Sequence, residues 1–179
     1  MKFIPHPYQQ FCIQQVIQKP AIGLFLDMGL GKTAITLTAV NELKYGRFQV
    51  RRILVIAPKK VAEATWQREA AKWDNLKHLR FSTVLGSTTK RIRALNTPAD
   101  VYVINRENVV WLVDYYKNDW PFDMVVVDEF SSFKSHSAKR IQSPGGHPAS
   151  HPPYRRLDRY AISERFGRPV EPGFFIGRR

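Results

Sequence analysis

A short glycine-rich stretch, LFLDMGLGKT at residues 24–33, carries residue types that can grip phosphate groups. Phosphate-binding loops commonly read G-x-x-x-x-G-K-[ST], and Gly31, Lys32 and Thr33 fit the end of that pattern. The position five before Gly31 departs from it, because Leu26 stands where the pattern has glycine. The stretch is therefore either a nucleotide site or a chance match inside an apolar segment.

The residues around this stretch favour the nucleotide site. Ala21–Leu26 is apolar and predicts a strand, and a helix is expected from Lys32 onward, so the glycines fall in a tight turn. Backbone N–H groups in such a turn and at a helix start attract phosphate. Gly29 and Gly31 would bring the backbone close to the anion. Lys32 would reach the β- and γ-phosphates, and the Thr33 hydroxyl would ligate Mg²⁺.

A second motif, MVVVDEF at residues 124–130, suits the other half of such a site. Four apolar residues predict a buried strand, and Asp128 and Glu129 follow at its carboxyl end. Two adjacent acids there are costly to bury unless they face water, a metal or a partner. Asp128 suits the magnesium shell opposite Thr33, and Glu129 suits the orienting or deprotonation of an attacking water. The predicted catalytic residues are Lys32, Asp128 and Glu129.

Short apolar runs alternate with stretches of helical period over residues 1–140. The predicted strands are Ala21–Leu26, Ile53–Ala57, Phe81–Leu85, Val101–Ile104 and Met124–Val127. The predicted helices are Tyr8–Gln18, Lys32–Leu43, Val61–Trp73, Lys90–Asn96 and Glu107–Lys117. This alternation predicts an α/β fold, a mostly parallel sheet with helices on both faces. Ligands of such sheets bind at the carboxyl ends of the strands.

Residues 141–179 differ in character from the rest and hold six of the 12 prolines and five of the ten glycines. We expect a domain at 1–140 followed by an irregular, disordered tail at 141–179. The tail has no lysine and is rich in Arg, Pro and Gly, whose codons are rich in G and C. This composition favours an out-of-frame reading of further coding sequence, and a real disordered basic tail is the alternative.

The net charge of +13 predicts a polyanionic partner such as nucleic acid, with plain solubility as the other explanation. The longest apolar runs are far shorter than the roughly 20 residues of a membrane-spanning helix, so no membrane association is expected. The single cysteine, Cys12, cannot form an internal disulfide, in agreement with a reducing cytoplasm. The five histidines lack zinc-site spacing.

Both motifs resemble those of Swi/Snf-type helicases of superfamily 2. Motif I of that family commonly reads D-E-M-G-L-G-K-T and also dispenses with the first glycine. The stretch DEFSSFKSHSAKR resembles motif II, usually D-E-x-H-x-x-K-N, with Ser131 in place of His and Ser135 in place of Asn. The resemblance implies a RecA-like P-loop NTPase lobe that uses ATP and Mg²⁺. It also implies that full-length relatives couple hydrolysis to movement along duplex DNA.

Weaker matches extend the resemblance to residues 5–140, closest to the compact helicases of bacteriophages and their hosts, which would place the protein in the cytoplasm of such a cell. The segment PYQ implies that Gln9 reads the adenine edge. The implied nucleotide-binding residues are Gln9, Met28, Gly29, Leu30, Gly31, Lys32 and Thr33. Segments similar to motifs Ia and Ib imply nucleic-acid contacts, with double-stranded DNA as the expected partner, at Lys59, Lys60, Asn105 and Arg106.

Family enzymes place ATP between two such lobes, and the second lobe supplies arginine fingers. The sequence shows neither the motif III strand nor that lobe after motif II, so we expect weak ATP binding and little hydrolysis from this chain alone. Two other functions stay open: a non-catalytic basic nucleic-acid-binding fragment, and a P-loop kinase of a small metabolite. The adjacent acids Asp128 and Glu129 and the PYQ segment argue against the kinase.

Overall fold

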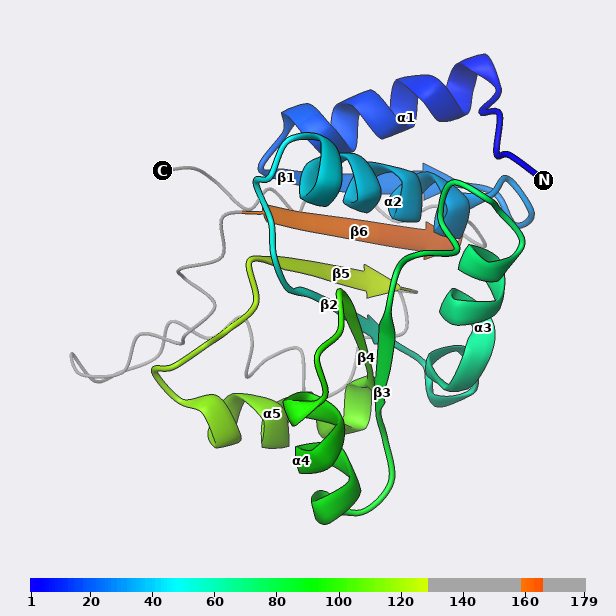
Figure 1. The fold of residues 1–179 in the computed structure, drawn as a ribbon. Coiled ribbons are helices and arrows are strands. Elements are labelled where there is room, and N and C mark those ends of the chain that lie inside the picture. The colour runs from blue at the N-terminus through cyan, green and yellow to red at the C-terminus, as the bar shows by residue number, and fades with distance from the viewer. Residues whose placement is uncertain (129–158, 166–179) are drawn as a thin grey trace.

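The computed structural model describes residues 1–128 and 159–165. Its six strands pair in parallel to form one sheet in the order β1-β6-β5-β2-β4-β3 (Figure 1). The strands are β1 (Ala21–Leu26), β2 (Ile53–Ala57), β3 (Phe81–Val84), β4 (Val101–Asn105), β5 (Met124–Asp128) and β6 (Arg159–Arg165). The helices are α1 (Pro7–Gln18), α2 (Lys32–Asn41), the π-helix η1 (Glu42–Gly46), α3 (Lys59–Ala71), α4 (Thr88–Asn96), the 3-10 turn η2 (Arg106–Asn108) and α5 (Val109–Tyr116).

Helices cover both faces of the sheet, with α1, α2 and α3 on one face and α4 and α5 on the other (Figure 1). Successive residues of a strand point to opposite faces. In β2, Ile53, Val55 and Ala57 therefore join the core under α1, α2 and α3, whereas Leu54 and Ile56 join the core under α4 and α5. All five are buried, which explains why the strand is apolar throughout.

The predicted elements agree with the structure to within about two residues at most ends. The bounds of β1 and β2 match the prediction, and β5 continues one residue further to include Asp128. Helix α2 was expected to reach Leu43. It ends at Asn41, and the chain continues as η1, in which the Arg47 N–H donates to the Glu42 carbonyl at 2.8 Å.

Within the expected tail, residues 159–165 form a strand that was not predicted from the sequence. These residues form β6, which lies between β1 and β5 and pairs in parallel with both. Proline and glycine on either side of the segment led the sequence analysis to assign the whole tail as irregular. Pairing on both sides supplies partners for the β6 backbone, and local composition does not record such partners. Within the described ranges, no helix is both long and apolar enough to cross a membrane.

Candidate nucleotide site

The predicted phosphate loop and the predicted metal ligand lie at one edge of the sheet. All strands are parallel, so the end of β1 at Leu26 and the end of β5 at Asp128 face the same way. Only β6 separates them, and Asp128 lies in register with Ser163 of that strand. Leu26 is in register with Arg165, two residues further along β6, so the two ends are staggered as well as separated by about 10 Å across the strands. Both ends open onto the same edge, where a ligand can contact the residues that follow each strand.

The two loop glycines adopt backbone conformations that favour glycine. Gly29 has φ 84° and Gly31 has φ 75°, both in the left-handed region, and Gly31 caps the start of α2. A Cβ atom on Gly31 would also lie 2.8 Å from the Gln9 side-chain nitrogen, whereas a Cβ on Gly29 would meet nothing within 4 Å. Leu26 still belongs to β1 and pairs with β6. The missing first glycine is therefore explained, because the turn begins only after Leu26.

Lys32 folds back over the turn that precedes it. Its ammonium nitrogen donates to the carbonyl oxygen of Leu26 at 2.5 Å and to that of Asp27 at 3.0 Å. Both acceptors are neutral, and an anionic phosphate oxygen is a stronger partner for an ammonium group. Thr33 follows in the first turn of α2 and is half-buried. The loop therefore holds a lysine and a hydroxyl where the sequence analysis expected them.

The start of α1 lies against the phosphate loop. The Leu30 carbonyl accepts hydrogen bonds from Gln9 Nε2 and from the Tyr8 hydroxyl, both at 3.3 Å. Gln9 is buried, and its Oε1 accepts from the His6 N–H at 2.9 Å. Gln9 therefore stands beside the loop, as expected of a residue that reads a base. Tyr8 was not predicted from the sequence, although it precedes Gln9 directly in the PYQ segment.

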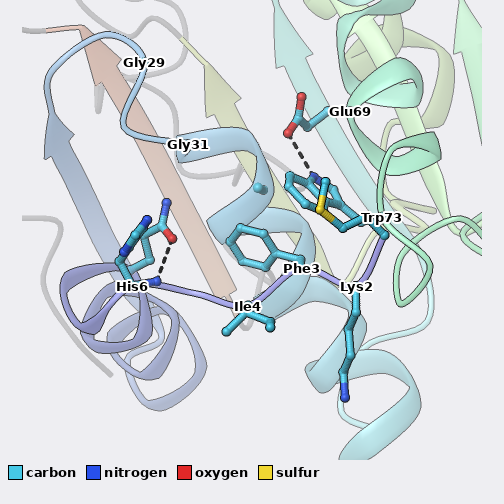
Figure 2. Close-up of a pocket in the computed structure, with 11 residues that line it drawn as sticks. Lys2, Phe3, Ile4, His6, Gly29, Gly31, Glu69 and Trp73 are labelled. Carbon is cyan, nitrogen blue, oxygen red and sulfur yellow. Dashed lines mark hydrogen bonds between the residues drawn. The ribbon is translucent and has the colours of Figure 1, made fainter.

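A cavity of about 570 Å³ opens between the loop and the chain start (Figure 2). Gly29 and Gly31 lie on one side, and Phe3 and Trp73 lie on the other. Gln9 also lines the cavity, next to Gly31. The two aromatic rings meet edge to face at 5.0 Å. An amide opposite aromatic rings offers a flat, partly apolar space that suits a nucleotide base. Phe3 was also missed, because nothing in the sequence pattern connects it with the loop.

Hydrogen bonds anchor the segment that carries Phe3. The Phe3 N–H donates to Asn75 Oδ1 at 2.9 Å, and the amino group of Met1 lies 2.9 Å from the Asp74 carboxylate. Hydrogen bonds from that amino group and from Lys77 lower the pKa of Asp74 to about 2. The Trp73 indole donates to Glu69 Oε1 at 3.0 Å, which fixes the ring on the other side of the cavity (Figure 2).

The predicted nucleic-acid contacts lie further along the same edge, where β2 and β4 are neighbours. Lys59 and Lys60 are exposed at the start of α3, and Arg106 is half-buried in η2. Asn105 differs from the expectation because it is only 7% exposed. Its amide donates to Glu107 Oε2 at 2.6 Å, and its carbonyl accepts from Asn108. The Asn105 side chain is therefore held within this turn, and its contact with nucleic acid stays a prediction.

The structure describes only the first acidic residue of the expected motif II. Asp128 is half-buried at the end of β5. Glu129, together with Ser131 and Ser135, lies outside the described residues, so its predicted role as the residue that activates water stays a prediction.

The sequence pattern of the SNF2-related domain matches residues 8–144. The chain belongs to the SNF2-related domain family. Protein p41 of Acyrthosiphon pisum secondary endosymbiont phage 1 is 40% identical over 134 residues. The match covers 74% of the SNF2-related chain and 29% of the phage protein, so the chain spans less than a third of this relative. The predicted Swi/Snf-type resemblance is confirmed.

Solved structures of helicases and related enzymes share the fold. The SWI2/SNF2 ATPase core of Sulfolobus solfataricus in complex with dsDNA aligns with a TM-score of 0.63 and 24% identity, over 92% of this chain and 32% of that one. The UvsW helicase of bacteriophage T4 aligns with a TM-score of 0.64 and 16% identity, over 90% of this chain and 52% of the helicase. The restriction-modification enzyme LlaGI in complex with a DNA substrate mimic aligns with a TM-score of 0.61 and 14% identity, over 92% of this chain and 18% of that enzyme. The α/β fold predicted for a RecA-like helicase lobe is confirmed.

Proposed function

We propose that this chain is the ATP-binding lobe of an SNF2-type, DNA-dependent ATPase. One observation carries the proposal: the lysine-bearing loop after β1 and Asp128 at the end of β5 lie at the same edge of the sheet, separated by one strand. Binding of a metal-bound triphosphate requires a cation for its phosphates and a carboxylate for its metal, and both residue types are present at this edge. Membership in the SNF2-related family supports the same function.

Each residue of the loop has a proposed task. Lys32 would leave the carbonyls of Leu26 and Asp27 and bind the β- and γ-phosphate oxygens. The Thr33 hydroxyl and the Asp128 carboxylate would hold Mg²⁺, largely through water. When bound, Mg²⁺ neutralises charge that develops on the phosphate oxygens. Glu129 would orient or deprotonate the attacking water.

The base of the nucleotide would occupy the cavity between the loop and the chain start. The Gln9 amide can donate and accept, as the edge of adenine requires. Its Nε2 already points to the Leu30 carbonyl, so base recognition and loop position are linked through one side chain. Phe3 and Trp73 supply apolar surface opposite this amide.

Duplex DNA would bind along the neighbouring part of the same edge. Lys59 and Lys60 are exposed there, Arg106 lies in the adjacent turn, and the chain carries a net charge of +13. We propose that hydrolysis needs a second lobe with arginine fingers, each worth about 10³ to 10⁵ in rate in phosphoryl transfer. This chain alone should therefore bind ATP and hydrolyse it slowly.

Titration with a fluorescent ATP analogue tests the proposal. The wild-type chain should bind the analogue in the presence of Mg²⁺ and lose affinity when Mg²⁺ is chelated. Lys32→Ala should abolish measurable binding, while Lys19→Ala, which removes an equal charge after α1, should bind like the wild type. Equal affinities of Lys32→Ala and Lys19→Ala would exclude the nucleotide site.

The net charge favours a second candidate, a non-catalytic fragment that binds nucleic acid through its surface charge. Such a fragment would bind duplex DNA in a salt-sensitive way and show no magnesium-dependent ATP binding. The same titration separates the two functions, because only the ATPase lobe should distinguish Lys32→Ala from the wild type.

A further inference from the structure

An arginine on the α4 side of the sheet edge is held on an aromatic stack. Arg91 lies in the first turn of α4, and Trp111 lies in the first turn of α5. The Arg91 guanidinium carbon is 4.0 Å from the centre of the Trp111 ring. On α5, the Trp111 ring stacks on Tyr115 at 5.4 Å with 24° between the planes. Three side chains from two helices therefore form one layered unit.

The stack fixes the arginine and still leaves it able to donate hydrogen bonds. A guanidinium over an indole is attracted by the ring and loses less conformational freedom when it later binds a ligand. Arg91 Nη2 donates to Thr88 Oγ1 at 3.1 Å. Its Nε is unpaired among the described residues but buried, so a ligand would use the other guanidinium N–H groups. A planar, pre-oriented guanidinium with donors to spare suits a phosphate group.

The charge around Arg91 is unbalanced. Lys90, Arg91 and Arg93 lie within α4, and the helix Thr88–Asn96 has no acidic residue. In the described part of the chain, none of the three lies within 4.0 Å of a carboxylate. Positive charge at the start of a helix also opposes the helix dipole. An anionic ligand would offset both effects.

The position of the stack connects it with the proposed DNA surface. Strand β3, which leads into α4, is the neighbour of β4, which leads through η2 into α5. Lys59, Arg106 and Arg91 therefore follow neighbouring strands along the carboxyl edge, in the order β2, β4, β3. Lys59 and Arg106 lie within two residues of their strand ends, whereas Arg91 lies one turn into α4, on the face of the sheet opposite α3.

We propose that Arg91, positioned by Trp111 and Tyr115 and assisted by Lys90, binds the phosphodiester backbone of duplex DNA. This inference rests on the proposed DNA binding and extends it to α4 and α5, beyond the segments that resemble motifs Ia and Ib. Continuity with Lys59 and Arg106 favours DNA over an acidic protein. The contact is to phosphate, so it carries no sequence preference.

Salt-dependent DNA binding by the full chain tests the inference. The affinity for a short fluorescent duplex of mixed sequence is measured at several salt concentrations. Arg91→Ala should lower the slope of log affinity against log salt by about one and weaken low-salt binding several-fold. Arg91→Lys keeps the charge but not the stacked plane, so it should keep the slope and bind about threefold more weakly. Arg47→Ala, an equal charge change beyond α2, is the matched control.

The outcomes separate this inference from the proposed function. If Arg91→Ala and Arg47→Ala bind the duplex equally, the Arg91 contact is wrong, whereas ATP binding that depends on Lys32 would still support the lobe. If Arg91→Lys binds the duplex as tightly as the wild type, the role of the stack is wrong. Absence of duplex binding by the wild-type chain at low salt overturns the inference as well. Circular dichroism of each variant shows that it is folded.

Discussion

The ammonium nitrogen of Lys32 lies 2.5 Å from the carbonyl oxygen of Leu26, the residue that stands where many phosphate loops have glycine. The lysine thus caps the end of the strand that feeds its own loop. Leu26 can be large because it still pairs within the sheet, and the chain turns only at the glycines that follow. Nucleotide binding would replace two neutral acceptors of Lys32 with charged ones.

Loss of Lys32 should therefore affect the protein with and without ligand. Lys32→Ala removes the hydrogen bonds to the carbonyls of Leu26 and Asp27, so we expect a loss of unfolding free energy of about 1 kcal/mol. Mg-ATP should raise the melting temperature of the wild type and not that of the variant. Thermal melts with and without Mg-ATP measure both effects. An equal ligand-induced shift in the two proteins would contradict the role given to Lys32.

The two loop glycines allow a matched comparison. Gly29→Ala and Gly31→Ala each place an alanine in the left-handed region, which costs about 1–2 kcal/mol. Only at Gly31 would the new Cβ approach Gln9 Nε2, at 2.8 Å. Gly31→Ala should therefore lose more stability and more ATP affinity than Gly29→Ala. Chemical denaturation and ATP titration of both variants check this order, and the reverse order would contradict the loop geometry.

Gln9 and Tyr8 both donate a hydrogen bond to the Leu30 carbonyl, and substitutions can distinguish their roles. Tyr8→Phe removes only a hydroxyl that holds the loop, so affinities for ATP and GTP should fall together. Gln9→Ala removes the proposed base contact, so the preference for ATP over GTP should fall by about tenfold, the worth of one hydrogen bond. Competition titrations with both nucleotides measure the preference. An unchanged preference in Gln9→Ala would place the base elsewhere.

Asp100, at the opposite edge of the sheet, should contribute to the free energy of unfolding without contacting the nucleotide site. Asp100 is fully buried, and it accepts from the Arg80 backbone N–H at 2.8 Å and from the Arg80 guanidinium at 3.2 Å. Lys44 lies 3.4 Å away. Asp100→Ala should lower the unfolding free energy by about 3 kcal/mol. Asp74→Ala, which breaks exposed ion pairs, should leave the unfolding free energy nearly unchanged.

The Asp100 network should also make stability depend on pH. Burial raises the pKa of Asp100, but hydrogen bonds from Arg80 and Tyr45 and the charge of Lys44 outweigh it, so the pKa is lowered. Because the pKa of Asp100 is lower in the folded than in the unfolded protein, its ionised carboxylate stabilises the fold at pH values above the unfolded pKa of about 3.9. This stabilisation is lost as the pH falls through the folded pKa. The stability difference between wild type and Asp100→Asn should therefore shrink below about pH 4. A constant difference in acid denaturation curves would contradict this.

The sequence predicted the elements whose pattern is local. Ile53–Ala57 is buried on both faces, so its apolar run identified β2 without further information. Long-range pairing was harder to predict, and β6 was missed because its strand partners β1 and β5 are distant in sequence. The same holds at the site. Glycine and lysine spacing identified the loop, but no local pattern could reveal the burial of Asn105 or the approach of Phe3 to Trp73.

The central claim is that the loop after β1 and the end of β5 hold one metal-bound nucleotide. The most direct measurement is a crystal structure of the chain with Mn²⁺ and a non-hydrolysable ATP analogue, using the anomalous signal of the metal. The account predicts one strong peak between the Thr33 hydroxyl and the Asp128 carboxylate, with Lys32 turned from the Leu26 carbonyl to the phosphates. A nucleotide bound with its metal away from Asp128, or with Lys32 still on its own loop, would contradict the account.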